Sequence, residues 1–158
     1  MKLLNLQVDI EQFFQQVAAA STRALLLDYD GTLAPFRIRR DEAVPYPEVR
    51  EILETILAGG HTRVVIISGR DVEQLLPLLG LEKHPEIWGS HGWEHLLPDG
   101  TYELGRIDEA ASARLTRAEA WAKEIGPPEN WERKPVSLAF HWRGLEDETA
   151  RLLKNAIL

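Results

Sequence analysis

The chain has 158 residues, no cysteine and a formal charge of −7. This length favours one domain, and the missing cysteines exclude disulfides, zinc–thiolate sites and cysteine nucleophiles. The negative charge argues against non-specific nucleic-acid binding, and no apolar stretch approaches the ~20 residues of a membrane span. We expect a cytoplasmic enzyme domain with no nucleic-acid and no membrane partner.

The N-terminal residues predict a helix and no secretory signal. Lys2 is a lone basic residue, and Asp9 and Glu11 interrupt the apolar run that a signal would need. Asp9 is placed to cap a helix that runs to about Ala20, with Gln12 at the capping-box position.

A run of four apolar residues, 24–27, ends in two carboxylates, Asp28 and Asp30. Such a run predicts a strand buried on both faces, as in parallel sheets. Ligand crevices of open α/β sheets lie beyond the carboxyl ends of the strands, and residues i and i+2 share one side. We therefore expect both carboxylates in one site, where Mg²⁺, which prefers oxygen ligands, would compensate their charge. A turn with capping aspartates is the simpler alternative.

Helices and apolar strands then alternate. Residues 36–46 predict a loop, and residues 49–57 carry an apolar helical face that Gly59-Gly60 ends. A second buried strand, 64–67, runs into Ser68-Gly69-Arg70, and Asp71 can cap a helix that Gly80 closes. Ile87-Trp88 predicts a short third strand. This order indicates βαβ units, so residues 24–28, 64–67 and about 86–89 should be adjacent parallel strands, with Asp28, Asp30 and Ser68 at their carboxyl edge.

The pattern changes near residue 96. Residues 96–102 predict a hairpin turn, and a helical face at 115–125 is stopped by Gly126-Pro127-Pro128. Residues 135–142 alternate as a half-buried strand, and a last helix is expected from about Glu146 to the end. We interpret residues 1–107 as an α/β, Rossmann-like parallel sheet and residues 108–158 as the start of an α+β module.

The residues at the strand ends suit phosphoryl transfer. Asp28 can attack phosphorus, and Asp30 can protonate the leaving oxygen and then deprotonate water. Backbone N–H groups around Gly31 and Thr32 could bind phosphate oxygens. In the second motif Ser68 could donate to phosphate, Gly69 allows close approach, and Arg70 can pair with phosphate or with an acidic neighbour. A strand-to-helix turn with a capping serine is the alternative for that triplet.

These motifs resemble a known family. Asp28 to Leu33 resembles the first motif of the haloacid dehalogenase superfamily, and Ser68-Gly69-Arg70 resembles the second. The wider pattern is similar to the trehalose-6-phosphate phosphatases, whose D-Y-D-G-T-L-x-P, S-G-R and G-x-H-G-x-E motifs appear here in order. Their cap strand, with E-x-K, a serine and H-x-R, is matched by Glu132, Lys134, Ser137, His141 and Arg143.

The resemblance implies a Mg²⁺-dependent phosphatase that hydrolyses trehalose 6-phosphate through an aspartyl-phosphate on Asp28. It implies that residues 1–107 are the first part of a haloacid dehalogenase-like core and residues 108–158 an incomplete cap. Its implied substrate-binding residues are His91, Glu94, Glu132, Lys134, His141 and Arg143. The simpler alternatives are that His91 and Glu94 organise a turn and that Glu132, Lys134 and Arg143 are surface charges.

Two motifs of the superfamily do not appear. The third is a lysine that helps hold the phosphoryl group, and the fourth is an acidic pair that completes the Mg²⁺ site. Asp147-Glu148 and Lys154 lie in a predicted helix and are poor substitutes. We therefore expect a truncated, weakly active or inactive chain whose partner is the missing C-terminal half of the enzyme. The alternatives are a non-catalytic binding or regulatory remnant and a capped phosphatase for another sugar phosphate.

Overall fold

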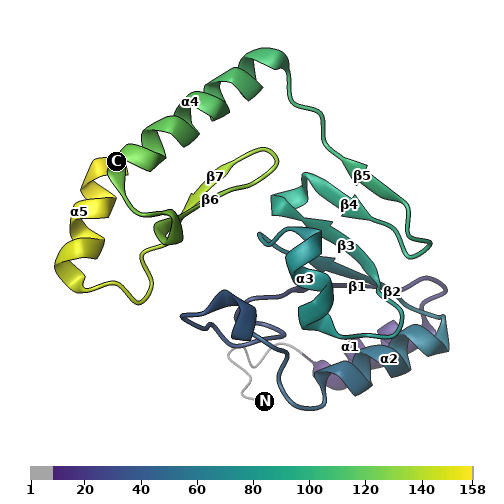
Figure 1. Cartoon of the computed structure of the whole chain (residues 1–158). Coiled ribbons are helices and arrows are strands. Elements are labelled where there is room, and N and C mark those ends of the chain that lie inside the picture. The colour runs from purple at the N-terminus through teal and green to yellow at the C-terminus, as the bar shows by residue number, and fades with distance from the viewer. Residues whose placement is uncertain (1–8, 158) are drawn as a thin grey trace.

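A five-stranded sheet forms the first part of the protein, in the order β1-β2-β3-β4-β5 (Figure 1). Its strands are β1 (Ala24–Asp28), β2 (Arg63–Ile67), β3 (Glu86–Gly89), β4 (Glu94–Leu96) and β5 (Tyr102–Leu104). The computed structural model describes residues 9–157. The expectation of no secretory signal concerns residues 1–8 and lies outside the described residues.

The first three strands are parallel, as the sequence predicts, and the sheet is of the α/β class. In the register of β1 and β2, Asp28 lies opposite Ile67, so both strands end at the same level. Strands β4 and β5 run antiparallel, which confirms the hairpin predicted around residues 96–102. The parallel register therefore brings the two sequence motifs to one edge of the sheet.

Three helices of this first part begin and end where the sequence predicts. They are α1 (Ile10–Ala19), α2 (Val49–Gly59) and α3 (Val72–Leu79). Asp9 caps α1 by accepting from the Gln12 amide at 2.9 Å, and Asp71 caps α3 by accepting from the Gln74 amide at 2.7 Å. The predicted loop 36–46 contains one short 3-10 turn, η1 (Arg40–Glu42).

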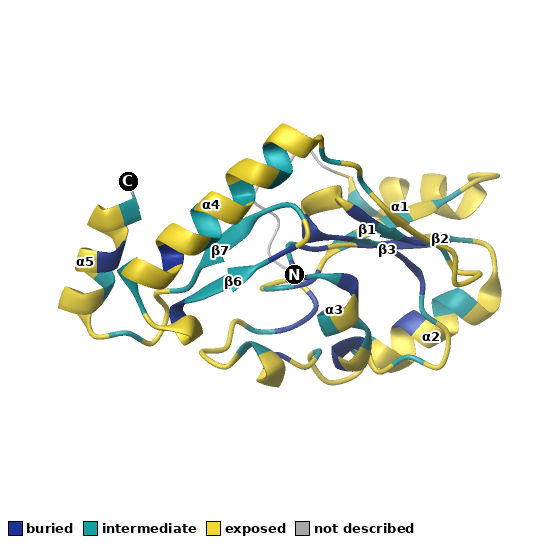
Figure 2. Ribbon diagram, turned by 45° about the horizontal axis from the view of Figure 1, so that its top comes forward, coloured by how far each residue is buried: buried dark blue, intermediate teal, exposed yellow. Residues whose placement is uncertain are grey.

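The hydrophobic core lies on the side of the sheet that α2 and α3 cover (Figure 2). Its fully buried members include Tyr29, Ile66, Leu75, Leu79 and Ile87. The Tyr29 hydroxyl donates to the Ala43 carbonyl at 2.7 Å, and burial raises the pKa of Tyr29 to about 12. This contact fixes the loop after β1 against the core, next to the predicted site.

The prediction that β1 is buried on both faces is wrong. β1 is the edge strand of the sheet, and Leu26 is 60% exposed. Leu26 and its neighbour Ile67 lie on the sheet face opposite the core, which no described helix buries. An apolar run therefore identified a parallel strand correctly, but it could not tell an interior strand from an edge strand.

The second part, residues 109–157, carries a two-stranded sheet and two long helices. Its elements are α4 (Glu109–Ile125), the 3-10 turn η3 (Pro128–Asn130), β6 (Trp131–Arg133), β7 (Leu138–Phe140) and α5 (Asp147–Ile157). A half-buried strand, β7, lies within the predicted range 135–142 but is shorter than predicted, and it pairs as an antiparallel hairpin with β6, which the sequence analysis did not predict. Pro135 cannot donate to a ladder, and residues 134–137 form the turn, with the Lys134 amide donating to the Ser137 carbonyl at 2.9 Å.

We call residues 9–104 the sheet part and residues 109–157 the C-terminal part. The β6–β7 hairpin lies between α4 and the sheet part (Figure 1). Within the described stretch 9–157, no helix has both the length and the apolar character that crossing a membrane requires.

Glu86 is the centre of a polar cluster on the uncovered sheet face. Its side chain is buried and accepts from Arg63 Nε and Nη2 at 2.6 and 2.8 Å and from Trp88 Nε1 at 3.0 Å. His95 Nε2 lies 2.9 Å from the same carboxylate, and its ring stacks on Trp88. The hydrogen bonds from Arg63 hold the pKa of Glu86 low, at about 2.

We predict that Glu86 makes stability depend on pH. Because its pKa is lower in the folded state than the ordinary 4.5, the stabilisation is complete above about pH 4.5 and is lost as the pH falls through about 2. Urea unfolding of Glu86→Gln should show a lower midpoint than the wild type at pH 7, and this difference should narrow below pH 4.5. Glu54→Gln, on the exposed face of α2 and outside this cluster, is the control. A difference that stays constant from pH 7 to pH 2.5 would contradict the prediction.

Candidate active site

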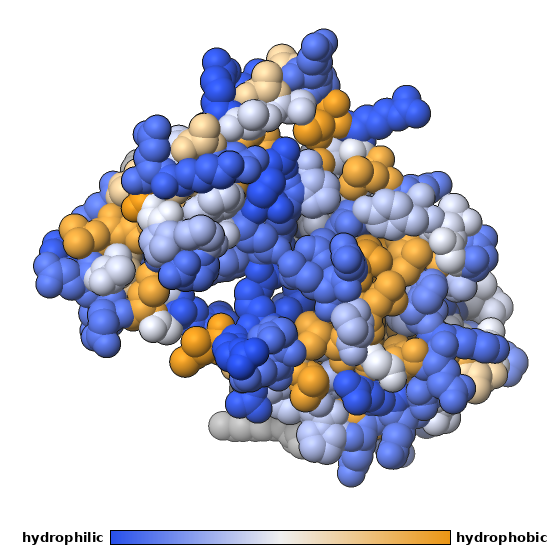
Figure 3. All heavy atoms as spheres, viewed as in Figure 1, coloured by the Kyte–Doolittle hydropathy of each residue, from blue (hydrophilic) through white to orange (hydrophobic). Residues whose placement is uncertain are grey.

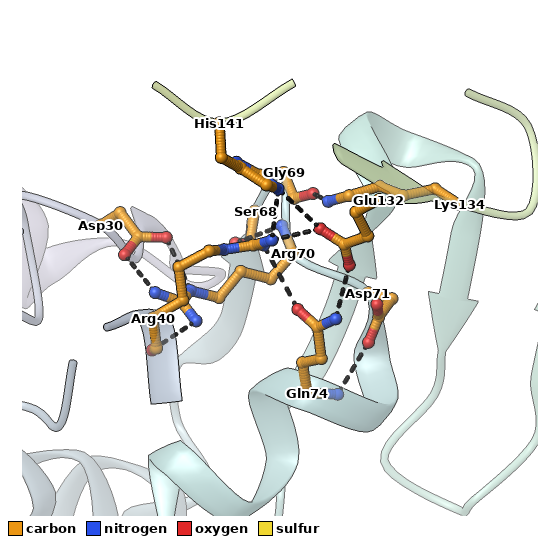
Figure 4. A network of polar contacts seen from close by, with 10 residues as sticks. All are labelled: Asp30, Arg40, Ser68, Gly69, Arg70, Asp71, Gln74, Glu132, Lys134 and His141. Atoms are coloured by element: carbon orange, nitrogen blue, oxygen red, sulfur yellow. Dashed lines mark hydrogen bonds and ion pairs between the residues drawn. The ribbon is translucent and has the colours of Figure 1, made fainter. Parts of the chain in front are cut away.

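The most strongly held contact of the site joins Asp30 to Arg70. Arg70 Nε and Nη2 donate to the two Asp30 carboxylate oxygens, both at 2.8 Å, and Arg70 Nη1 donates to the Arg40 carbonyl at 2.8 Å (Figure 4). The Arg70 side chain is buried, which would lower its pKa, but the hydrogen bonds and the charge of Asp30 raise it. Of the two partners that the sequence offered Arg70, the structure selects the acidic neighbour.

Asp28 has a much freer carboxylate. It is the last residue of β1, and among residues 9–157 the one side-chain hydrogen bond found for it is with the Thr32 hydroxyl at 3.4 Å, at the long limit of a hydrogen bond. Asp28 lines a cavity of about 650 Å³ on the uncovered side of the sheet, together with Ser68, Gly69 and His91. Asp28 and Ser68 thus meet at the carboxyl edge, as predicted.

The two carboxylates do not line the same cavity. Asp30 lines a separate cavity of about 370 Å³ between the sheet part and the C-terminal part. His91 lines both cavities, so it lies at the boundary between Asp28 and Asp30. The chain turns sharply at residues 29–34, and strand alternation does not describe this turn.

The turn after β1 uses its own amides. The Gly31 amide donates to the Ala34 carbonyl at 2.7 Å, and the Thr32 amide donates to the Tyr29 carbonyl at 3.3 Å. Both amides are therefore engaged within the turn in this structure, and the binding of phosphate by Gly31 and Thr32 stays a prediction. Gly31 has φ 87°, and a Cβ there would lie 2.7 Å from the Phe36 ring, so the tight turn requires glycine.

The Ser68-Gly69-Arg70 segment is closely packed. The Ser68 hydroxyl accepts from the Arg70 amide at 3.1 Å, and Asp71, not Ser68, caps the following helix. A Cβ on residue 69 would lie 2.6 Å from the His91 ring, which explains glycine at this position. His91 is in a left-handed conformation, with φ 59°, which places its ring against Gly69.

Glu94 is engaged in the interior of the sheet part. It is buried, and its oxygens accept from the Ser90 hydroxyl at 2.6 Å, the Tyr102 hydroxyl at 2.8 Å and the Val72 amide at 3.3 Å. These contacts support the alternative that Glu94 organises the turn between β3 and β4.

Two charged residues of the C-terminal part reach the sheet part. Lys134 is buried and donates to the Gly69 carbonyl, and burial lowers its pKa. Glu132 accepts from Arg40 and from Gln74 Nε2, the latter at 2.6 Å, and lies 3.1 Å from His141 Nε2. The alternative that Glu132 and Lys134 are surface charges is therefore wrong.

Arg143 is exposed and lines the cavity that contains Asp30. Its guanidinium lies over the Phe36 ring, 4.8 Å from the centroid, and donates to the Arg37 carbonyl at 3.3 Å. Figure 3 shows hydrophilic side chains on both sides of the hollow between the two parts of the molecule. The cationic side chains that line the Asp30 cavity are Arg37, Arg40, Arg70, Lys134 and Arg143. This arrangement suits an anionic ligand.

Sequence reasoning missed two residues of this network. Arg40 lies in a charged loop and Gln74 in the first turn of α3, and each contacts Glu132 (Figure 4). Arg40 Nη2 also donates to Gln74 Oε1 at 3.2 Å. The sequence feature that could have identified Gln74 as a site residue is its position, about one helical turn after the second motif. Nothing local distinguished Arg40 from the neighbouring arginines.

The donor set fits Mg²⁺ only in part. Among residues 9–157 no group of three or more His, Asp or Glu side chains is arranged to hold a metal ion. Mg²⁺ is commonly bound by one or two carboxylates together with water and substrate phosphates. Asp28 is free to be such a ligand, whereas both Asp30 oxygens are engaged by Arg70. Asp28 therefore fits the ion as one carboxylate ligand, whereas Asp30, as it lies in this structure, does not.

Comparison with known proteins identifies relatives of this arrangement. A family model described as trehalose-phosphatase matches residues 26–157. A trehalose-phosphate phosphatase of Mycobacterium leprae is 34% identical over 127 residues, which are 77% of this chain and 28% of the relative. The C-terminal domain of Candida albicans trehalose-6-phosphate phosphatase has a similar structure, with TM-score 0.77 and 23% identity over 94% of this chain and 52% of that one.

The fold extends to a broader group. A haloacid dehalogenase-like hydrolase from B. subtilis superposes with TM-score 0.50 and 19% identity, covering 70% of this chain and 35% of its own. The predicted haloacid dehalogenase type of fold is thereby confirmed. The chain spans less than a third of the length of the curated relatives that it matches.

We predict that Arg70→Lys destabilises the protein by about 2 kcal/mol, because one ammonium cannot replace a buried two-bond pair with Asp30. The free energy of unfolding, measured with urea at pH 7, should fall by this amount. Arg39→Lys is the matched control, since Arg39 pairs with Asp41 while both side chains are largely exposed. Equal, small effects of the two substitutions would show that the Asp30–Arg70 pair does not stabilise the turn.

Proposed function

This chain belongs to the trehalose-phosphatase family, and on that premise we propose that it acts in Mg²⁺-dependent hydrolysis of trehalose 6-phosphate. Asp28 is the nucleophile and Asp30 the general acid and base in this proposal. Residues 1–107 act as the core and residues 108–158 as a cap over the cavity between them.

The observation that carries the proposal is the difference between the two carboxylates. A nucleophile needs an unengaged oxygen, and Asp28 has one at the strand end beside Ser68. A proton-transfer group needs a fixed position, and Arg70 fixes Asp30 with two hydrogen bonds. Two carboxylates one residue apart therefore have environments that suit two different roles.

The proposed reaction has two displacements. An Asp28 oxygen attacks phosphorus, the bond from phosphorus to the sugar oxygen breaks, and Asp30 gives that oxygen a proton. Water, which Asp30 deprotonates, then attacks phosphorus and releases phosphate and the free Asp28 carboxylate. Asp30 is fully engaged by Arg70 in this structure. A substrate phosphate that takes donors of Arg70 would release an Asp30 oxygen for this role.

Charge neutralisation is the main remaining requirement of phosphoryl transfer. Mg²⁺ bound at Asp28 would supply part of it. Lys134 and Arg143 offer positive charge from the C-terminal part, and both line the cavity that contains Asp30. Trehalose 6-phosphate as the substrate rests on the names of the relatives and on the polar side chains Glu132 and His141, which suit sugar hydroxyls.

The proposal predicts phosphate release from trehalose 6-phosphate that requires both Mg²⁺ and Asp28. Asp28→Asn should lower the rate by roughly 10³-fold or more, because an amide cannot serve as the nucleophile. Because little or no activity is expected of the chain alone, phosphate release is measured with a coupled colorimetric assay on the chain joined to the C-terminal remainder of a trehalose-phosphatase relative. Asp147→Asn, at the exposed start of α5, is the control and should leave the rate unchanged.

Other outcomes distinguish the alternatives. Release from glucose 6-phosphate but not from trehalose 6-phosphate would indicate a phosphatase of another sugar phosphate. No release and no binding of beryllium trifluoride when the C-terminal remainder is supplied would indicate a non-catalytic binding module. Near-normal activity of Asp28→Asn would place the nucleophile elsewhere.

A further inference from the structure

Two of the five side-chain hydrogen bonds found between the described residues of the C-terminal part and of the sheet part end on one carboxylate, that of Glu132. Oε2 accepts from Arg40 of η1, and Oε1 accepts from Gln74 of α3 at 2.6 Å. His141 of the C-terminal part lies 3.1 Å from Oε2. Donors from the sheet part therefore hold a side chain of the β6–β7 hairpin in place (Figure 4).

Arg40 also connects this contact to the catalytic turn. Its carbonyl accepts from Arg70 Nη1 at 2.8 Å, and Arg70 in turn holds Asp30 through two hydrogen bonds. The backbone of Arg40 thus supports the proposed acid–base residue, while its side chain supports a residue of the C-terminal part. Among the described residues, no other residue has both a hydrogen bond with Arg70 and one with the C-terminal part.

Solvent does not readily replace the hydrogen-bond partners of Glu132. Its side chain is 19% exposed and that of Arg40 is 31% exposed, so solvent compensates poorly for a lost hydrogen bond. Hydrogen bonds from His141, Gln74 and Arg40 hold the pKa of Glu132 well below its usual range, so the carboxylate stays charged. A charged, half-buried group that loses Arg40 would move to find other donors or water.

The acceptor capacity of Glu132 is nearly used. Each carboxylate oxygen has about two acceptor positions. Arg40 and His141 lie at Oε2, and Gln74 occupies one position of Oε1. One position of Oε1 remains for a substrate hydroxyl, and its direction is set by the same donors.

We propose that Arg40 is a positioning residue that docks Glu132, and with it the β6–β7 hairpin, so that Glu132 presents one fixed acceptor to a substrate hydroxyl. Gln74 assists from the other oxygen. The substrate part of this inference rests on the proposed function, whereas the docking part does not.

Arg39 supplies a matched control on the same turn. Its guanidinium pairs with Asp41 at 2.8 Å and with Glu42 at 3.2 Å, and its side chain is 68% exposed. Both partners lie within residues 39–42, and no contact of the Arg39 side chain with the C-terminal part is found among the described residues. Replacing Arg39 removes the same charge from the turn without removing the contact with Glu132.

The docking part is tested by a distance measurement that needs no activity. Because the chain has no cysteine, Glu54→Cys on α2 and Ala120→Cys on α4, both exposed, give two unique spin-label positions. Pulsed electron spin resonance should give a broader or longer distance distribution for Arg40→Gln and for Glu132→Gln. Arg40→Gln with Glu132→Gln together should match the single variants, and Arg39→Gln should match the wild type.

Several results would overturn the docking claim. They are an unchanged distribution in Arg40→Gln, an additive effect of the two substitutions, and the same broadening in Arg39→Gln. Circular dichroism of each variant identifies loss of folding. If Arg40→Gln does not fold, Arg40→Lys replaces it in the measurement, because lysine keeps the charge but lacks the second terminal nitrogen donor of arginine. Its distance distribution is then compared with that of Glu132→Gln.

The substrate part is tested by calorimetric binding of trehalose 6-phosphate and of inorganic phosphate to the full chain. Arg40→Gln should weaken trehalose 6-phosphate binding by roughly tenfold and phosphate binding, to which the charge of Arg40 in the cavity contributes, by clearly less, because phosphate has no sugar hydroxyl for Glu132. Arg40→Lys should recover part of the loss. Equal losses for both probes, or tighter binding of trehalose 6-phosphate, would overturn the claim. Failure of the wild type to bind trehalose 6-phosphate would instead count against the proposed function, and the spin-label result would stand alone.

Discussion

The buried guanidinium of Arg70 needs a counter-charge, and the way this need is met organises the site. A buried charge is tolerated when its donors are satisfied, and Asp30 and the Arg40 carbonyl together satisfy three donors of Arg70. Asp30 belongs to the turn after β1, and Arg40 to the loop that follows it. One guanidinium from the end of β2 therefore fixes the turn, the loop and the acidic group that the proposed chemistry uses.

The charged side chains of the C-terminal part are likewise held by partners on the sheet part. Lys134 and Glu132 project from one short hairpin, and each finds its partner on the sheet part, at Gly69 and at Arg40 with Gln74. Both contacts end next to the two sequence motifs. A shift of the β6–β7 hairpin would therefore move groups that lie next to the proposed phosphate site. Glu132 and Lys134 thus have a structural role in addition to the proposed binding of substrate.

Much of this arrangement could be predicted because it is local or periodic. The caps Asp9 and Asp71, the parallel strands and the meeting of Asp28 with Ser68 follow from residue type and spacing. The edge position of β1 and the β6–β7 hairpin do not, because they depend on which neighbours a strand finds. Arg40 was missed for the same reason, since its partner Glu132 lies 92 residues away in the sequence.

The central claim is that Asp28 accepts the phosphoryl group. The most direct measurement is to react the chain with trehalose 6-phosphate and Mg²⁺, quench in acid, reduce with borohydride and locate the modified residue by mass spectrometry. Reduction converts an aspartyl-phosphate to homoserine, so the account predicts homoserine at position 28 and an unmodified Asp30. Homoserine at position 30 or at any other aspartate, with Asp28 intact, would contradict it.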